Sequence, residues 1–396
     1  MNLELSPRQQ RMIDLAAELA ARFAPRVDAD DRAGRFPSEN YAELHQSGYL
    51  RLIIPAELGG AGASLYETVL IQERLAQGDG ATAMAVNMTM HLIGRQRETR
   101  AWPAAIFEAI CRDIADHGAL INGAASEPEL GSPSRGGMPA TTAAPADGGW
   151  LVSGRKQFVS MAPVLRYFVT SVALPASAEW PQGASANAIV RAPADGLRLE
   201  DTWGDALGLR TSGSYDVFYD QVFVPDAWLV DRHAPGQAPA AGPPTASAWF
   251  ALTMAAVYLG IGQAAIDAVC RYAHERVPSA LGRPIATLPA IQRRVGEGQA
   301  PLGAARAALY TTAHDWAARP ELREGMLPRI ALAKYLCTNA AVAATDQALR
   351  IAGGFGLTRT LPLERLHRDA RAGLTHPPND DAALEQIGRA ALEQWR

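Results

Sequence analysis

The middle of the chain, residues 119–233, differs in texture from the segments on either side, and this contrast restricts the fold more than any other feature. Runs rich in β-branched and aromatic residues, such as RYFVTSVAL and GSYDVFYDQVFVP, are bounded there by Gly, Pro, Asp and Ser. Such runs are typical of strands joined by turns. Residues 6–118 and the segments after residue 245 show helical periodicity instead. The order helical, β, helical predicts an α+β fold.

This order divides the chain into domains. We predict an N-terminal helical domain over 1–118, a middle β domain of antiparallel barrel or sandwich type over 119–233, a linker over 234–244, and a C-terminal four-helix bundle over 245–396. The linker is indicated by the Pro-, Gly- and Ala-rich run APGQAPAAGPP. We expect the bundle helices over 246–275, 286–317, 325–352 and 380–395. A β domain set between two helical parts favours clefts where they meet.

Local signals mark several helix ends. Ser6 before a proline, and Ser64 three residues before Glu67, are predicted N-caps. Asn379 is the predicted N-cap of the last helix. The segment ATAMAVNMTMHLIG, residues 81–94, is apolar nearly all round and predicts a buried helix.

Composition excludes several kinds of partner. The net charge is -4 with no basic block, so we expect neither nucleic acid nor a membrane surface as a partner. The three cysteines, Cys111, Cys270 and Cys337, have no metal-ligand spacing and predict reduced thiols in the core. We expect no apolar run long enough to span a bilayer and no signal peptide, and therefore a cytoplasmic location.

Six stretches carry recognisable motifs in a fixed order. They are IPAELGGAGAS (54–64), ASEPELGSPS (125–134), DGGWLVSGRKQFVSMAP (147–163), LGLRTSGSYDVFYDQVFVP (207–225), YAHERVPSALGRPI (272–285) and RIAGGFGLTRTLPLERLHRDAR (350–371). In this order they resemble the acyl-CoA dehydrogenase superfamily of flavoproteins. The resemblance covers nearly the whole chain and implies FAD as the cofactor, with FMN the less favoured choice.

The resemblance also implies roles for individual residues. Ser126, next to Ala125, would bond the pyrimidine edge of the flavin, Phe158 would flank the ring, and Ser160 would bond near N5. Gly131 and Ser132 would let backbone approach the cofactor closely.

A second group of residues would hold the far half of FAD. Arg276 would pair with the pyrophosphate, and the turn at Gly353 and Gly354 would admit the adenosine half from a neighbouring subunit, so a homodimer or homotetramer is implied. Leu281 stands where the family places an aromatic residue, because the RVPSALG turn is longer than the family's.

The catalytic base of the family is missing. Dehydrogenases remove an α-proton from an acyl thioester with a Glu just after the RDAR-like segment, and an ungapped count maps that Glu to Pro377 and the preceding Tyr to His376. An alternative position of the base maps to Phe250, followed by Ala251. Neither position carries a carboxylate.

A branch of the superfamily, the dibenzothiophene monooxygenase type, needs no such base. Its members add oxygen to reduced flavin as a C4a-hydroperoxide and carry a His-Asp-Pro stretch in the same region, to which THPPND is similar. That chemistry needs a dry pocket and a group that titrates near neutrality, for which histidine is suited.

Two histidines are candidates for this group. His376 either lines the active site or is a solvent-facing turn residue, with Pro377 and Pro378 stiffening the backbone after it. His91, in the predicted buried helix, is either a catalytic residue or a hydrogen-bonded core histidine. Trp249 and Phe250 are either apolar pocket walls or helix-packing residues.

The favoured hypothesis is a flavin-dependent monooxygenase acting on an aromatic, heteroaromatic or amine-type small molecule. Catalytic residues would be His376, His91 and Ser160. A separate reductase would supply the reduced flavin, because no nicotinamide-binding motif follows a strand, and O2 would be the co-substrate. The alternative is an acyl-CoA or acyl-carrier dehydrogenase with its base relocated to Asp380, Asp381 or Glu385. A flavin-free binding protein is the third hypothesis.

Overall fold

The N-terminal part of the protein is helical, as predicted. The computed structural model describes residues 5–129, 137–234 and 243–395. The N-terminal helices are α1 (Pro7–Ala33), α2 (Ser38–Gln46), α3 (Leu65–Ala76), α4 (Gly80–Thr99) and α5 (Ala104–His117). The predicted caps are confirmed, because Ser6 and Ser64 each accept a bond from the backbone of the third residue beyond and form capping boxes. The predicted buried helix is α4.

The middle part is one twisted sheet. Its strands are β1 (Ile121–Ala124), β2 (Thr142–Ala146), β3 (Gly149–Val159), β4 (Tyr167–Leu174), β5 (Ala184–Arg191), β6 (Leu197–Glu200), β7 (Tyr215–Pro225) and β8 (Leu229–His233). They pair in the order β6-β7-β3-β2-β4-β5-β8, with β1 added against β4. Most pairs are antiparallel, as expected. However, β1 and β2 both run parallel to β4, because their pairing is set by long-range packing and not by a hairpin turn.

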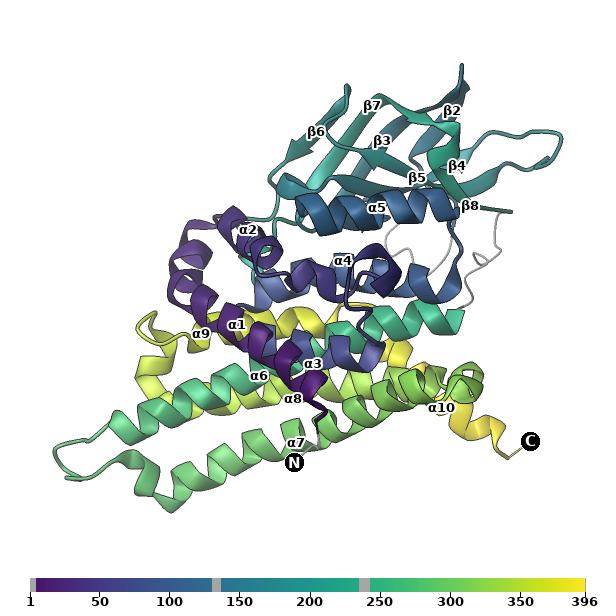
Figure 1. Ribbon diagram of the computed structural model, residues 1–396. Coiled ribbons are helices and arrows are strands. Elements are labelled where there is room, and N and C mark those ends of the chain that lie inside the picture. The colour runs from purple at the N-terminus through teal and green to yellow at the C-terminus, as the bar shows by residue number, and fades with distance from the viewer. Residues whose placement is uncertain (1–4, 130–136, 235–242, 396) are drawn as a thin grey trace.

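The C-terminal part is a bundle built around one central helix. Its helices are α6 (Pro243–Glu275), α7 (Pro289–Ala318), α8 (Leu327–Ala352), α9 (Leu363–Arg371) and α10 (Asp380–Glu393). Helix α6 packs on α7, α8 and also α3 and α4, and Figure 1 shows the N-terminal helices lying between the sheet and this bundle. Of the predicted linker, residues 235–242 lie outside the described residues, and α6 begins at Pro243.

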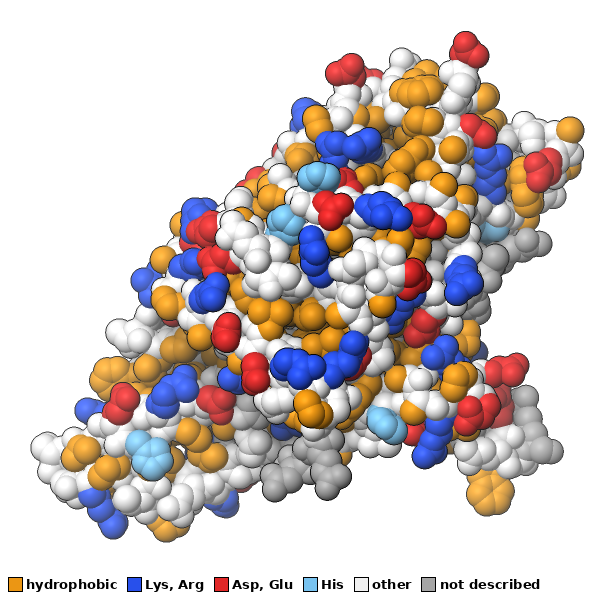
Figure 2. Space-filling model, in the orientation of Figure 1, with side chains coloured by type: hydrophobic (Ala, Val, Ile, Leu, Met, Phe, Trp, Pro, Cys, Tyr) orange, Lys and Arg blue, Asp and Glu red, His pale blue; other side chains and the backbone are white. Residues whose placement is uncertain are grey.

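Helix α6 corrects one expectation. Its segment Pro244–Glu275 is long and apolar enough to cross a membrane by length and composition, contrary to the prediction that no run would be. Its most apolar stretch is 83% buried inside the protein, which identifies it as the core helix of the bundle. On the face shown in Figure 2, Lys and Arg side chains are interspersed with Asp and Glu.

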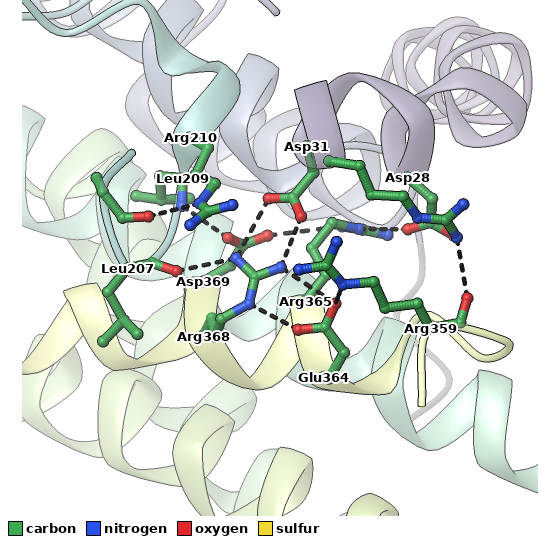
Figure 3. Close-up of polar contacts among 12 residues, drawn as sticks. Asp28, Asp31, Leu207, Leu209, Arg210, Arg359, Glu364, Arg365, Arg368 and Asp369 are labelled. Atoms are coloured by element: carbon green, nitrogen blue, oxygen red, sulfur yellow. Dashed lines mark hydrogen bonds and ion pairs between the residues drawn. The ribbon is translucent and has the colours of Figure 1, made fainter. Parts of the chain in front are cut away.

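A charged network fastens α9 to the rest of the molecule (Figure 3). Arg368 pairs with Asp31 of α1 at 2.6 Å and donates to the carbonyl of Leu207 at 2.9 Å. Asp369 accepts a bond from the backbone N–H of Leu209 at 2.7 Å. Because the segment with His376 follows α9 directly, this network fixes where that segment starts.

Candidate functional site

The segment with Ala125 and Ser126 is fastened to the sheet by a buried carboxylate. Glu127 is bonded by Lys156 Nζ of β3 at 2.6 Å, and both side chains are shielded from solvent, at 1% and 0% exposure. The backbone N–H groups of Ala140 and Thr141 also donate to Glu127, at 2.7 and 2.9 Å. Burial alone would raise the pKa of Glu127, but the bonds from Lys156 and Thr141 lower it below its ordinary value.

The remaining predicted residues of this loop are only partly placed. The Ser126 carbonyl accepts a bond from the backbone N–H of Gln157 at 3.0 Å, and the side chains of Ala125 and Ser126 are half-buried. Gly131 and Ser132 lie outside the described residues.

The end of β3 presents an aromatic ring and a hydroxyl. Phe158 has a φ of 61°, lies next to an irregularity in the β3–β7 register and is 53% exposed. Its ring meets Trp203 edge-on, with centroids 5.6 Å apart. An exposed Phe held at positive φ is costly without a partner, so this ring is positioned to contact a bound group.

Ser160 begins a row of hydroxyl groups. Its Oγ lies 2.8 Å from Ser214 Oγ, which lies 2.7 Å from the Oγ of Ser212. Its carbonyl accepts a bond from Asn122 Nδ2 at 3.0 Å. Ser212, Ser214 and Asn122 were not predicted, because they are far from Ser160 in sequence and become its neighbours only in the folded chain.

His91 is close to this strand end. Two residues before it on α4, Thr89 Oγ1 donates to the carbonyl of Ile121 at 2.9 Å, and the next residue, Asn122, holds Ser160. The imidazole of His91 meets the Phe250 ring edge-on, with centroids 5.1 Å apart. Burial, and then the Arg95 guanidinium, lower the pKa of His91 to about 3, so the ring is neutral at physiological pH.

Trp249 is a core residue. Its side chain is fully buried, and a Cβ added to Gly94 of α4 would lie 2.2 Å from its Cζ3 atom. Only a glycine therefore leaves room for the indole. Trp249 and Phe250 were both predicted as possible pocket walls. Only Phe250 is partly exposed, and its ring faces His91.

His376 lies against α6 as well. Its Nδ1 is 2.6 Å from the Oη atom of Tyr258, a buried residue about two helical turns after Phe250. Burial, and then the ammonium of Lys334, lower the pKa of His376 to about 4. Like His91, His376 therefore does not titrate near neutrality, contrary to the expectation from the sequence. The imidazole is half-buried and is anchored to the bundle, which a solvent-facing turn residue would not be. The predicted N-cap after it is confirmed, because Asn379 accepts a bond from the backbone N–H of Ala382 at 3.0 Å.

The residues predicted for the far half of FAD meet at one end of the bundle. The Arg276 guanidinium lies 5.3 Å from the centre of the Phe355 ring, and in the described ranges no carboxylate forms an ion pair with it. Gly353, at a φ of 57°, and Gly354 have open space where a Cβ would lie. Leu281 is half-buried in the turn after α6. This end is open to a ligand or a second chain.

Within residues 5–129, 137–234 and 243–395, no group of three or more His, Cys, Asp or Glu side chains could hold a metal ion. The three cysteines are free; Cys111 and Cys337 are buried, and Cys270 is half-buried.

Comparison with known proteins identifies the family. Models of the N-terminal, middle and C-terminal domains of acyl-CoA dehydrogenases match residues 6–97, 122–222 and 252–380. YdbM of Bacillus subtilis, which carries an acyl-CoA dehydrogenase name, is 37% identical over 396 residues, 99% of this chain and 100% of that protein. Fold and matches define the class as a flavin-dependent oxidoreductase with helical, β and helical domains. The chain belongs to the acyl-CoA dehydrogenase family.

One further relative has a different activity in its name, and a similar solved structure holds FMN and an amino sugar nucleotide. L-evernosamine nitrososynthase of a Micromonospora species is 30% identical over 93% of this chain and 86% of its own. The structure of KijD3 in complex with FMN and a dTDP-amino-keto sugar aligns with a TM-score of 0.86 at 27% identity, covering 99% of this chain and 95% of that one. The family members similar to this chain therefore include both types of enzyme.

Proposed function

We propose that the protein is a flavin-dependent monooxygenase that oxygenates an amine-type small molecule. The observation that carries this proposal is the histidine found, in place of a carboxylate, in the segment where a dehydrogenase needs its base. His376 is held there, neutral, by Tyr258. The names of the nitrososynthases, which are similar along most of the chain, favour an amine over an aromatic substrate.

Of the three carboxylates available for a relocated base, two are exposed and one is partly buried. Asp380 accepts a bond from Asn339 Nδ2 at 3.0 Å and faces a buried lysine at 3.7 Å. Asp381 is exposed on the first turn of α10. Glu385 is 71% exposed and pairs with Arg389 at 2.6 Å. Asp380 Oδ1 is buried and accepts no hydrogen bond from the described residues, so Asp380 is the one of the three that is placed as a base for a carbon acid could be, with the Lys334 ammonium opposite it.

The residues present fit a flavin. Phe158 offers an exposed apolar face and Ser160 a hydroxyl beside it, which suit the ring. Arg276 offers a guanidinium and the Gly353 turn open backbone, which suit a pyrophosphate and an adenosine. We therefore favour FAD shared between subunits of a homodimer or homotetramer. When bound and reduced by a separate reductase, the flavin would supply the electrons that activate O2.

The chain itself would position the substrate and move its proton. Phe250 and the neutral His91 form a largely apolar wall that excludes water. An alkylammonium must lose a proton before its nitrogen can be oxygenated, and His376 can accept that proton at Nε2. This requires the tautomer in which His376 Nδ1–H donates to the Tyr258 oxygen. Tyr258 keeps its own proton, because burial raises its pKa well above the ordinary value.

The test supplies purified protein with FAD, a flavin reductase, NADH, O2 and a panel of amines and amino sugars, and analyses products by mass spectrometry. We expect a product one oxygen atom heavier, and loss of that product in His376→Asn with the flavin still bound. The exposed Glu385→Gln serves as the matched control and should keep wild-type turnover. Anaerobic bleaching of the flavin by an acyl-CoA would refute the proposal.

The dehydrogenase remains the second candidate, because YdbM covers the full chain at 37% identity. It predicts anaerobic flavin reduction by an acyl-CoA that is lost in Asp380→Asn. The same panel of proteins therefore decides between the two reactions.

A further inference from the structure

A buried lysine lies behind the His376 segment. Lys334 of α8 has a fully buried side chain, and its Nζ donates to the carbonyl of Gly373 at 2.8 Å. The same atom lies 3.7 Å from Asp380 Oδ1. Gly373 precedes His376 in the chain and Asp380 follows it. One ammonium group thus donates a hydrogen bond at one end of the segment that contains the histidine and forms an ion pair at the other end.

The segment has no space to move at this point. A Cβ added to Gly373 would lie 2.9 Å from Thr338 Cγ2 on α8 and 3.1 Å from Tyr258 Cδ1 on α6. Asn339, also on α8, donates to the other oxygen of Asp380 at 3.0 Å. The backbone before His376 is therefore clamped between two bundle helices, and Lys334 is the one charged group of α8 in that clamp.

The buried ammonium of Lys334 does not favour folding by itself. Burial lowers the pKa of Lys334 to about 8, although Asp380 opposes the shift. Replacing both members of a buried ion pair by apolar residues is often neutral or stabilising, so stability alone does not account for a lysine in this place. The Tyr258 hydroxyl contacts the imidazole. The Lys334 ammonium lies behind the segment, bonded to the carbonyl of Gly373 and paired with Asp380 of α10. Lys334 is the cation that acts on His376, and like charge disfavours protonation of the ring.

We propose that Lys334 is a positioning residue of the active site, which fixes His376 against Tyr258 and keeps its imidazole uncharged. It touches neither substrate nor flavin in this role and acts through the histidine. The effect of Lys334 on turnover rests on the proposed monooxygenase function, whereas its effect on the position and charge of His376 does not rest on it.

The first experiment uses the unaltered protein. With 15N-labelled histidine, the imidazole nitrogens of His376, assigned with His376→Asn, are followed by NMR from pH 4 to pH 10. We expect His376 to stay neutral down to about pH 5 and its nitrogen shifts to move again near pH 8, where Lys334 loses its proton. A flat response between pH 7 and 9 would overturn the proposal, and this result does not depend on any variant folding.

Variants then separate charge from bonding. In Lys334→Met we expect the pKa of His376 to rise by at least about one unit, a tenfold change in proton affinity, and in Lys334→Arg to stay near the wild-type value. The matched control Asn339→Ala removes a bond to Asp380 without changing charge, and should leave the pKa of His376 unchanged. Folding is checked by circular dichroism. An unchanged pKa in folded Lys334→Met would overturn the proposal.

Turnover gives the final arm. If the enzyme oxygenates amines, the acid limb of its kcat profile should shift in Lys334→Met by the same amount as the pKa of His376, with KM little changed. If no oxygenation occurs while the NMR coupling is present, the proposed function fails and the positioning role stands. If oxygenation occurs but the NMR coupling between His376 and Lys334 is absent, the proposed function stands and the positioning role of Lys334 fails.

Discussion

Replacing Glu127 by Gln should destabilise the loop beside Phe158 far more than the loss of an ordinary ion pair would. The carboxylate has a 2.6 Å bond to Lys156 with both side chains shielded from solvent. In Glu127→Gln, the Lys156 ammonium stays buried without its carboxylate partner, and its remaining bond is to Ser171 Oγ at 2.9 Å. Breaking a buried pair in this way costs about 3–5 kcal/mol. The exposed pair Arg198–Glu200, at 60% and 54% exposure, is the internal control, since pairs of that kind contribute about 0–1 kcal/mol.

Hydrogen exchange gives the assay a local readout. The backbone N–H groups of Ala140 and Thr141 both donate to Glu127. Their protection should fall by about 100-fold or more in Glu127→Gln, as 3 kcal/mol implies, and remain unchanged in Glu200→Gln. Because bonds to the ionised carboxylate lower the pKa of Glu127, this contribution is present at neutral pH and is lost as the pH falls through that lowered value.

A double-mutant cycle tests the reason for the effect. Glu127→Gln with Lys156→Met removes both charges and leaves no unpaired ammonium. The double variant should therefore be clearly more stable than the sum of the two single losses predicts, with an interaction energy of about 1–3 kcal/mol. If the losses add within about 0.5 kcal/mol, the damage comes from packing or from the neutral bonds, and the reasoning about the buried charge is wrong.

Three further predictions follow from the site. First, His91 and His376 have pKa values of about 3 and 4, below the ordinary value of 6.5, so the unfolded chain binds more protons in acid than the folded chain does. The free energy of unfolding should therefore fall as the pH drops from 6.5 towards 4, by up to about 3 kcal/mol for His376. Urea denaturation should show that this fall is shallower in His91→Gln than in the wild type. Second, Gly94→Ala should cost about 1–3 kcal/mol or prevent folding, because the new Cβ would lie 2.2 Å from Trp249; Gly388→Ala, on the open face of α10 where a Cβ meets no atom within 4 Å, is the control in the same thermal melt. Third, Arg276→Gln should weaken FAD binding at least tenfold and leave FMN binding unchanged, measured by fluorescence titration; equal weakening of both would contradict a pyrophosphate role.

Features with local signals could be predicted from the sequence. The helix starts after Ser6, Ser64 and Asn379 are confirmed, since each cap bonds to backbone only three residues away. The helical, β, helical order is confirmed for the same reason, because periodicity is a property of neighbouring residues.

Features that depend on contacts between residues far apart in the chain could not be predicted from the sequence. The parallel pairing of β1 and β2 with β4 leaves no turn signature. Tyr258 is the partner of His376 although 118 residues separate them. Trp249 and Phe250 are adjacent in sequence, yet one fills the space beside Gly94 and the other faces His91. Because α6 is apolar nearly all round, its pattern does not indicate which face borders the site.

The proposed function requires that the family fold keep its geometry without a carboxylate base at the usual position. Tyr258 belongs to α6 and Lys334 to α8, so the groups that hold the His376 segment are themselves held by packing that the bundle needs in any case. A residue exchanged at the His376 position therefore enters a fixed frame and does not have to order itself on binding, which is the condition for a precise catalytic group. The Arg368 and Asp369 contacts fix the start of the segment and the Lys334 contacts fix both ends around the histidine. The frame is thus independent of the side chain at position 376. Under the proposed function, His376 accepts a proton from an amine and lies next to Pro377, the position to which the count maps the family's Glu.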